Sequence, residues 1–444
     1  MTASGPIGSS DAAFSTTGFA DPPRLREHAH HMRLLSDLAY LLTIILTMPF
    51  WLTRMVLRGR LRTDWPGRLG LGPALPPASG RRILLHAVSV GEVNAIRTLV
   101  RLLEQQADVE VVISSTTDTG IERARSLYSS RHAVVRYPLD FSLSVSSFLK
   151  RVQPDAVSLV ELEVWPNFVA DCCRRRIDVS VINGRLSARS FRRYRWVRWL
   201  LKSSFRRLNR VIAQSEDYAG RFKAMGARPD TVQVASSLKW DNTTTSPEGA
   251  DELASELGLD RNRLVIVAGS TAPEEHALLH SAVPAGVQLI CAPRRPEWFD
   301  AAADVFTGCT RRTAGRQGSN PDRFLLDTIG ELSQAYSLAD IVVIGRSFGE
   351  RHGSDPAEPA GMGKPVVIGP AVDDFLEMVE ILSSAGGLVQ CTAEALSGVL
   401  EELVSSDQRR KVIAENALDA IQGRQGGSQV TLQALLLGGG PVQK

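Results

Sequence analysis

A carboxylate follows the first apolar run of the chain's α/β pattern. In HAVSVGEVNA, residues 86–95, Glu92 comes after the apolar residues 83–85 and opens a segment with helical spacing. The stretch predicts a strand, a turn through Gly91 and a helix with Glu92 in its first turn. An acid there caps the helix, whose dipole favours a carboxylate by about 0.3–1 kcal/mol and lowers its pKa. Alternatively, it faces a cleft and accepts a proton.

Other acids and bases follow other apolar runs. SLVELEVWPNF places Glu161 and Glu163 after AVSLV, where buried acids are costly unless they face water or a ligand, so solvated loop acids are the alternative. CAPRRPEWF places Arg294 and Arg295 at a strand end, where guanidinium groups bind phosphate well. The turn GST, residues 269–271, precedes a helix whose N–H groups either hold a phosphate or simply cap the turn. These patterns favour a site for an anionic ligand.

The elements that must position these side chains repeat along the chain. Short runs rich in Val and Ile alternate with helical segments from residue 81 to 238, and again from 263 to 391. Such alternation indicates parallel sheets covered on both faces, with ligands at the carboxyl ends of the strands. The polar segment DNTTTSPEGA separates the two series. We expect an α/β protein with two Rossmann-like domains, residues 80–240 and 261–425, facing a cleft, and a C-terminal tail or helix, 426–444.

Composition excludes several classes of protein. The 444 residues, 43% hydrophobic and 22% charged, are enough for two full cores. The five cysteines form no CxxC pair, which argues against a disulfide framework and structural zinc and favours a reducing compartment. His276 and His280 lack a third ligand, so no metal site is predicted. A net charge of +3 does not indicate a nucleic-acid partner.

The N-terminal end differs from the rest. Residues 1–33, rich in Ser, Thr, Ala and Pro, are expected to be a disordered tail. Residues 34–60 contain sixteen uncharged residues between Asp37 and Arg54, followed by further arginines. We expect a helix that spans the membrane or lies in its interface, with the later domains on the cytoplasmic side. A helix buried in the first domain is the alternative. Residues 70–80 are expected to be a linker.

Nine motifs occur in a defined order: HAVSVGE, ELEVWPN, NGRLSARS, SLKWD, AGST, APRRPEWF, DTIGEL, DPAEPAGMGKPV and GPAVDDF. The chain carries these motifs in the order and spacing of the Kdo transferases, and it resembles that family from about residue 34 to the end. That family moves 3-deoxy-D-manno-octulosonic acid (Kdo) from CMP-Kdo to the lipid A precursor, lipid IVA. The resemblance implies the glycosyltransferase B fold, with a membrane anchor, an acceptor-binding first domain and a CMP-binding second domain. It implies no cofactor and no metal.

Roles for individual residues follow from the resemblance. Glu92 would be the proton acceptor, Glu161 would stabilise the transition state, and Lys239 would offset charge on the departing phosphate. The implied CMP-binding residues are Ser270, Pro293, Arg294, Ile329, Gly330, Glu331, Asp355, Pro356, Ala357 and Glu358. The implied acceptor-binding residues are Ser89, Gly91, Glu163 and Arg185.

The donor half departs from the family's pattern at residues 352–355, where HGSD replaces Gly-Gly-His-Asn. A carboxylate at Asp355 repels a nucleotide phosphate unless a cation pairs with it. Arg346, Arg351 and His352 are close in sequence, and we expect compensation, with Arg351 or His352 favoured. Three functions therefore stay open: a Kdo transferase, a transferase of the same fold with another nucleotide sugar, and a silent membrane protein that binds lipid or nucleotide. Retention of the predicted catalytic residues disfavours the third.

Residues 185–210 form a basic and aromatic stretch. They include ten Lys or Arg residues and no acid, interleaved with Tyr194, Trp196, Trp199 and Phe205. Such a stretch suits a membrane surface with anionic lipids. A solvated helix face and contact with phosphates of the acceptor lipid are alternatives. Interleaved basic and aromatic residues also occur in proteins that bind nucleic acid. We do not expect that partner here, because the stretch lies beside a membrane anchor.

Overall fold

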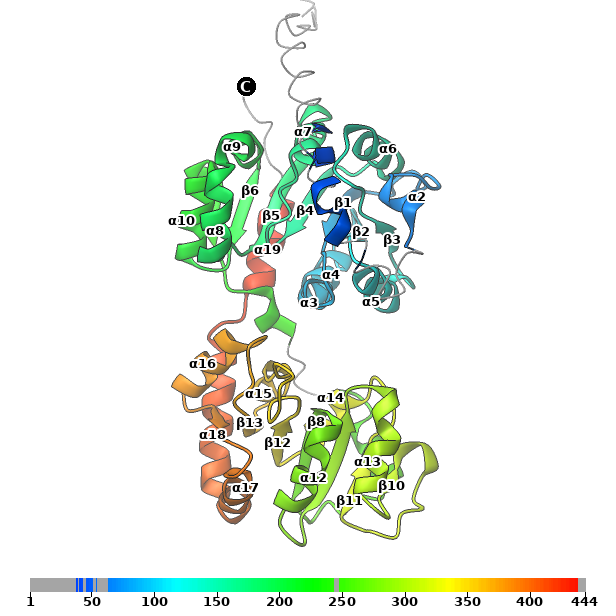
Figure 1. The fold of residues 1–444 in the computed structure, drawn as a ribbon, viewed down its shortest axis with the longest axis vertical. Coiled ribbons are helices and arrows are strands. Elements are labelled where there is room, and N and C mark those ends of the chain that lie inside the picture. Colours follow the sequence, from blue (N-terminus) through cyan, green and yellow to red (C-terminus); the bar gives the residue numbers. More distant parts are fainter. Residues whose placement is uncertain are drawn as a thin grey trace, which may run out of the picture.

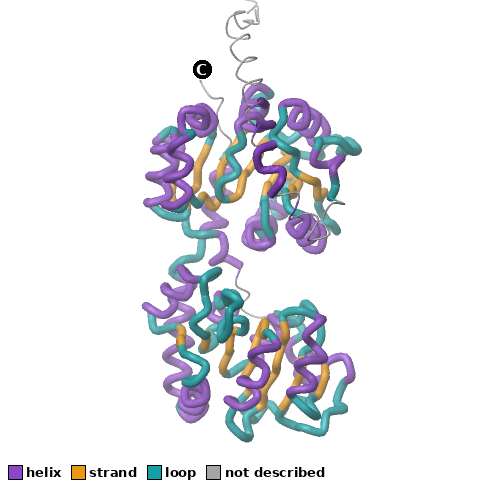
Figure 2. The backbone as a smooth tube through the Cα atoms, viewed as in Figure 1, coloured by secondary structure: helices purple, strands orange, loops and turns teal. Residues whose placement is uncertain are grey.

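The computed structural model describes residues 37–38, 40–42, 45–50, 53, 63–242 and 247–437. The expected tail at residues 1–33 and the arginines from 54 to 62 lie outside the described residues. Figure 1 shows two α/β units joined by η2 and by the chain that leads into α19. Figure 2 shows the strands of each unit gathered into its own sheet, with helices around it. The two-domain α/β prediction is confirmed.

The first domain is a parallel seven-stranded sheet in the order β3-β2-β1-β4-β5-β6-β7. Its strands are β1 (Arg81–His86), β2 (Val109–Ser115), β3 (Ala133–Arg136), β4 (Ala156–Val160), β5 (Asp178–Gly184), β6 (Arg210–Ala213) and β7 (Val232–Val234). Its helices are α2 (Trp65–Arg68), α3 (Val90–Ala95), α4 (Arg97–Glu104), α5 (Asp118–Tyr128), α6 (Ser142–Val152), α7 (Pro166–Arg174), α8 (Ala188–Trp196), α9 (Arg198–Arg206) and α10 (Glu216–Met225). The apolar runs are buried on both faces of this sheet because helices cover both, and they form two core clusters.

The second domain is a parallel seven-stranded sheet in the order β10-β11-β9-β8-β12-β13-β14. Its strands are β8 (Val265–Thr271), β9 (Gln288–Pro293), β10 (Thr310–Arg311), β11 (Arg323–Leu325), β12 (Ile341–Ile344), β13 (Val366–Ile368) and β14 (Leu388–Gln390). Its helices are α11 (Ala250–Leu257), α12 (Pro273–Ala282), α13 (Phe299–Val305), α14 (Leu332–Leu338), α15 (Ala357–Gly361), α16 (Leu376–Ser384), α17 (Leu396–Ser405) and α18 (Asp407–Gln422). The sequence analysis did not predict the two-residue β10, which lacks an apolar run.

Two crossings connect the domains. The 3₁₀ turn η2 (Leu238–Asn242) follows the first sheet, and α19 (Gly427–Leu436) returns to the first domain after α18. Leu432 and Leu435 join a core cluster of the first domain, and Leu435 O accepts a hydrogen bond from Arg81 Nη1 at 2.8 Å. Asp241 joins the two crossings, since its carboxylate accepts from the backbone N–H groups of Gly426 and Ser428 at 2.6 and 2.5 Å.

Some of the N-terminal residues lie against the first domain. Asp37 Oδ1 accepts from Ser142 N and Asn167 Nδ2, both at 2.9 Å, and the Tyr40 ring meets Phe141 edge-on at 5.0 Å. The apolar side chains around them are exposed rather than buried: Leu38, Leu41, Leu42, Ile45, Leu46, Met48 and Phe50. No helix within the described residues is long and apolar enough to cross a bilayer. The spanning form of the expected anchor is therefore not confirmed.

The expected linker at residues 70–80 is exposed along most of its length. It contacts the first domain at a few points: Leu75 N donates to Arg151 O at 3.0 Å, and the Leu75 side chain packs against a core cluster. Gly70 has a φ of 76°, and a Cβ there would lie 2.1 Å from Ser144 O, which explains the glycine at this close approach.

Candidate active site

A cavity of about 400 Å³ lies between the two domains. It brings together seven of the predicted residues: Gly91, Lys239, Ser270, Arg294, Asp355, Ala357 and Glu358. Gly91 and Lys239 come from the first domain, and the other five come from the carboxyl side of the second sheet. The predicted cleft is therefore present, and residues far apart in sequence share one cavity.

Glu92 is the third residue of α3, whose N-cap is Ser89. Its carboxylate accepts from Val88 N at 2.9 Å and from Ser89 Oγ at 3.0 Å, while Ser89 Oγ accepts from Glu92 N at 3.3 Å. Glu92 therefore does cap the helix, as the first alternative stated. Burial raises the pKa of Glu92 to about 7, and the nearby Glu161 adds to the rise. The lowering expected from the helix dipole is outweighed, because desolvation disfavours the charged form.

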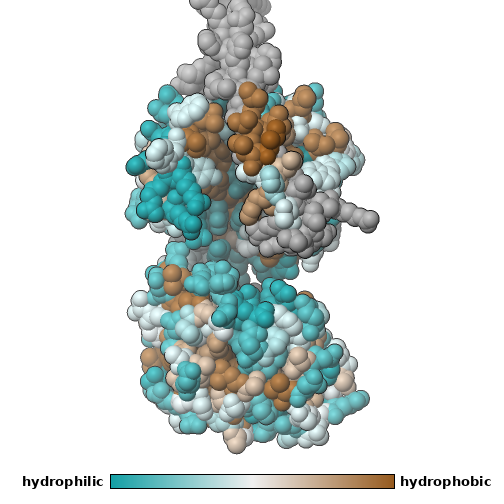
Figure 3. All heavy atoms as spheres, in the orientation of Figure 1, coloured by the Kyte–Doolittle hydropathy of each residue, from teal (hydrophilic) through white to brown (hydrophobic). Residues whose placement is uncertain are grey.

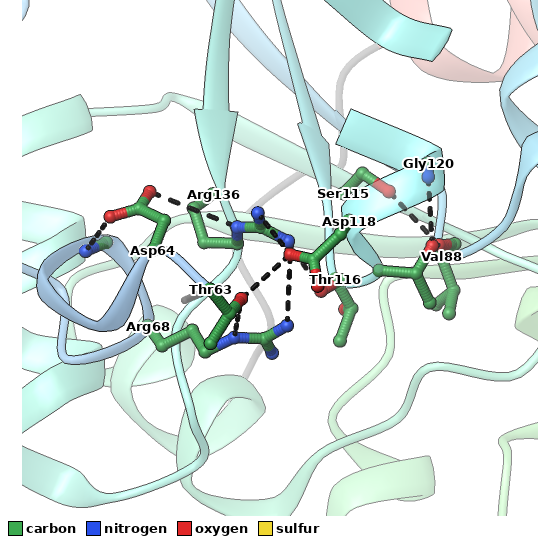
Figure 4. Close-up of polar contacts among 11 residues, drawn as sticks. Thr63, Asp64, Arg68, Val88, Ser115, Thr116, Asp118, Gly120 and Arg136 are labelled. Carbon is green, nitrogen blue, oxygen red and sulfur yellow. Dashed lines mark hydrogen bonds and ion pairs between the residues drawn. The ribbon is translucent and has the colours of Figure 1, made fainter. Parts of the chain in front are cut away.

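The loop that carries these bonds is held by the turn between β2 and α5. Val88 O accepts from Ser115 Oγ at 3.1 Å and from Thr117 Oγ1 at 2.7 Å. Figure 4 shows Val88 beside this turn, and it shows the side chains of Thr63, Arg68 and Arg136 converging on Asp118 at the start of α5. Asp118 Oδ1 accepts from Thr63 Oγ1 at 2.7 Å and from Arg136 Nη2 at 2.8 Å. These contacts fix the backbone amide to which Glu92 is bound.

Glu161 and Glu163 lie at the end of β4, beside Glu92. Both carboxylates contribute to raising the Glu92 pKa, so the three acids form one cluster. Trp165 Nε1 donates to Glu163 Oε2 at 2.7 Å, and burial raises the pKa of Glu163. This cluster borders the predicted acceptor side. The exposed Arg185 lines a smaller cavity of about 280 Å³ between the domains, which also contains Lys239 and Glu377.

Strained backbone gathers at the strand ends that face the cleft. Glu161, Asn183, Ser270 and Arg346 have positive φ values of 63°, 51°, 57° and 61°. Each such residue costs about 1–3 kcal/mol and is typical of functional sites. The sequence analysis missed Asn183. Its Oδ1 accepts from Leu238 N and Ser237 Oγ, both at 3.1 Å, which positions the turn carrying Lys239.

The donor side contains Asp355 and Glu358. Asp355 Oδ1 accepts from Ala357 N at 2.9 Å, and the Ser333 hydroxyl donates to Glu358. Enclosure between the domains raises the pKa of both carboxylates, although the Asp355 side chain remains accessible from the cavity. The positive charge of Lys239 opposes this rise in the pKa of Asp355.

The expected compensation of Asp355 by Arg351 or His352 is wrong. Arg351 pairs with Glu274, and His352 Nδ1 lies 2.8 Å from Asp373 Oδ2. Closeness in the sequence did not predict the ion pairs of Arg351 and His352, because the loop turns both side chains away from Asp355 toward acids of other segments.

The remaining predicted donor residues do not line the cavity. Pro293 and Pro356 are buried, whereas Ile329 is 66% exposed and Gly330 is exposed. Glu331 pairs with Arg312 at 3.0 Å. The 329–331 turn leads into α14, whose Leu332 lines the cavity and whose Ser333 hydroxyl donates to Glu358.

Glu275, like Asn183, was not predicted from the sequence to have a role at the strand ends. It is the third residue of α12, the same helical position that Glu92 has in α3, but it is 1% exposed. Its carboxylate accepts from the backbone N–H groups of Ala272, Arg346, Ser347 and Phe348 at 2.9, 2.7, 2.9 and 3.1 Å. Glu275 therefore ties α12 to the loop after β12. Its role is structural, whereas Glu92 at the matching position borders the cleft.

His276 is also buried, and its Nε2 lies 3.1 Å from Thr271 Oγ1. Burial lowers the pKa of His276 to about 4, so the ring is neutral. Within the part of the chain that the structure describes, no group of three His, Cys, Asp or Glu side chains is arranged to hold a metal ion.

Two parallel-sheet α/β domains with a polar cavity at their strand ends have the architecture of the glycosyltransferase B fold. Among solved structures, a UDP-GlcNAc 2-epimerase from Neisseria meningitidis shares this fold, with a TM-score of 0.56 and 13% identity over 80% of this chain and 100% of that one. The family model described as 3-deoxy-D-manno-octulosonic-acid transferase (kdotransferase) matches residues 63–242. The chain belongs to that family, as curated relatives at 30% identity show.

Curated relatives agree with this assignment. A 3-deoxy-D-manno-octulosonic acid transferase of Haemophilus influenzae is 30% identical over 379 residues, which cover 81% of this chain and 87% of the relative. The corresponding protein of Bordetella pertussis is 30% identical over 412 residues, 87% of this chain and 94% of the relative. The resemblance to the Kdo transferases is confirmed, and with it membership of a glycosyltransferase family.

Proposed function

We propose that this protein transfers Kdo from CMP-Kdo to lipid IVA in one displacement, with Glu92 as general base. The observation that carries the proposal is the position of Glu92: a half-buried carboxylate with a pKa of about 7, next to Gly91, which lines an interdomain cavity rich in cations. A carboxylate with this pKa is half ionised near neutral pH, which suits a general base.

The proposed reaction assigns a task to each side of the cleft. Glu92 takes the proton of an acceptor hydroxyl as its oxygen bonds to the anomeric carbon of Kdo. The bond from that carbon to the phosphate oxygen breaks, CMP leaves, and the configuration inverts. Lys239 and Arg294 line the cavity where they stabilise the charge that develops on the phosphate. Asp355 and Glu358 face the nucleotide, and their carboxylates suit the ribose hydroxyls.

The test is direct. Purified protein is incubated with CMP-Kdo and lipid IVA, and mass spectrometry of the lipid product detects each added Kdo. Parallel reactions with other CMP and UDP sugars test the alternative of a different donor. Transfer from another sugar alone would replace the proposal with that activity, and no transfer from any donor would favour a silent binding protein.

A pH profile tests the role of Glu92 independently. Because burial raises the Glu92 pKa to about 7, the ionised base is lost as the pH falls through 7. We expect kcat/KM to fall about tenfold per pH unit below 7 and to level off above it. Initial rates between pH 5.5 and 8.5 measure this, with circular dichroism as a control for folding. A profile that stays flat between pH 6 and 7.5 would contradict the role.

We also propose that the protein is attached to the cytoplasmic face of the inner membrane. Trp196 and Trp199 on α8 and α9 are 84% and 74% exposed, and none of the residues of α8 is buried. Figure 3 shows a gathering of apolar residues on the face of the first domain that it displays. Exposed tryptophans among arginines suit a surface of anionic lipids.

Removing residues 1–53 is expected to lower binding to vesicles of phosphatidylglycerol and phosphatidylethanolamine several-fold. The exposed apolar residues between 38 and 50 are lost, whereas the basic surface of α8 and α9 remains. Co-sedimentation measures the bound fraction. Both domains should stay folded, with a slightly lower melting temperature because the Asp37 and Tyr40 contacts are removed. Aggregation of the truncated chain would instead show that this segment belongs to the core.

A further inference from the structure

The cavity between the domains has an unbalanced set of charges. Five cations line it, Arg97, Arg123, Lys239, Arg294 and Arg346, but only two acids, Asp355 and Glu358. Such an excess of positive charge in an enclosed space is costly unless an anion occupies it. The single charge of a phosphodiester offsets only part of it.

Three of these cations, the half-buried Arg97 and Arg123 and the exposed Arg294, have few protein partners within the described residues. Among the described residues, neither Arg97 nor Arg294 has a hydrogen bond or ion pair through its guanidinium group. Arg123 donates only through Nε, to Asn94 Oδ1 at 2.8 Å. Burial lowers the pKa of Arg123, and repulsion from Arg97 and Arg294 lowers it further. The guanidinium groups are therefore close enough to repel one another across the cleft.

The arginines come from opposite walls. Arg294 follows β9 and Arg346 follows β12, at the strand ends of the second domain where a nucleotide phosphate is expected. Arg97 and Arg123 belong to α4 and α5 of the first domain, the wall that also carries Glu92. Arg97 and Arg123 were not predicted as site residues, because arginines inside amphipathic helices have the pattern of ordinary surface residues.

The chemistry of the donor supplies a second anion. In CMP-Kdo the anomeric carbon bears both the phosphate ester oxygen and a carboxylate. That carbon must lie between Glu92, which activates the attacking hydroxyl, and the phosphate on the second domain. A carboxylate on the same carbon then lies near the first-domain wall, within reach of guanidinium groups that bind carboxylates well.

We propose that Arg97 and Arg123 bind the carboxylate of the sugar and thereby select a donor built on a 2-keto acid. The inference rests on the proposed function, since it deepens the description of the same site. Arg97 and Arg123 contribute to the affinity for intact CMP-Kdo, whereas the arginines of the second domain contribute to the affinity for its CMP part. Glu358 lines the same cavity from the second domain, and the charge of Arg97 acts against the rise in its pKa.

The test compares two ligands in matched variants. Isothermal titration measures the Kd of CMP and of CMP-Kdo for the wild type, Arg97→Ala, Arg123→Ala and the control Arg101→Ala. Arg101 lies one turn along α4, is exposed and does not line the cavity. Each cavity variant should bind CMP-Kdo at least tenfold more weakly while its Kd for CMP changes less than threefold. The control should match the wild type for both ligands, and thermal unfolding verifies that all variants are folded.

Three results overturn the inference. Equal weakening for CMP and CMP-Kdo would assign the pair to the phosphate, and unchanged Kd values for both ligands would leave the pair without a role in donor binding. A wild type that binds CMP-Kdo no tighter than CMP also refutes it, whatever the activity. If the wild type discriminates as expected but transfers no Kdo to lipid IVA, the proposed function fails and the carboxylate site stands.

Discussion

Glu92→Gln should bind CMP with nearly unchanged affinity and transfer Kdo about 10²–10⁴ times more slowly than the wild type. The amide keeps the size of the side chain and can still accept the hydrogen bond from Val88 N, but it cannot take a proton at neutral pH. Rates of lipid product formation, together with titration of CMP, measure the two effects separately. The residual rate should also lose its dependence on pH near 7.

The capping role of Glu92 makes a control necessary. Ser89→Ala removes the hydroxyl that both caps α3 and donates to Glu92, without touching the carboxylate. Loss of such a cap costs about 1 kcal/mol of stability, so this variant should melt earlier but keep most of its activity. If Glu92→Gln and Ser89→Ala lose activity equally, Glu92 acts through the helix and not as a base.

Glu275→Gln should destabilise the second domain by about 3 kcal/mol or more. The carboxylate is 1% exposed and accepts four backbone N–H bonds, from α12 and from the loop after β12. An amide replaces one acceptor oxygen by a donor, so at least one buried N–H loses its partner and faces another donor. Urea unfolding followed by tryptophan fluorescence and circular dichroism measures the loss.

The neighbouring Glu274 provides the matched control. Its side chain is 40% exposed and pairs with Arg351 at the surface. Exposed pairs contribute about 0–1 kcal/mol, so Glu274→Gln should unfold nearly as the wild type does. Similar losses of unfolding free energy for both variants would show that the buried Glu275 hydrogen bonds contribute no more to stability than the exposed ion pair of Glu274. Glu92 and Glu275 would then contrast two acids at one helical position, the first proposed to serve turnover and the second to serve stability.

The sequence was sufficient to predict both sheets. Runs such as VEVVISS and DIVVIG predict strands buried on both faces, and the regular return of helical segments predicts parallel order. The ends of those strands also located the acids and bases of the cleft, since parallel strands present their carboxyl ends at one edge. Glu92, Ser270, Arg294 and Glu358 were found in this way because each lies just after an apolar run or at the start of a helix.

Other parts of the site had no local signal. Asn183 reads as a turn residue, and only the fold shows that it holds the segment carrying Lys239. The partners predicted for Asp355 were wrong because loop residues close in sequence pair with distant acids. The 329–331 turn carries a motif of the family but does not line the cavity between the domains.

What the sequence by itself determined is local: strand and helix order, the two α/β series, and the residues at strand ends, all of which follow from hydrophobic period and backbone preference. The tertiary structure alone decided which of these residues meet. Helix α19 follows the second domain in sequence yet packs on the first, through Leu432 and Leu435. Arg97, Arg123 and Arg294 converge on one cavity from two domains. Burial and charge proximity set the Glu92 pKa and the chemistry of the cleft, and both depend on contacts between segments far apart in the chain.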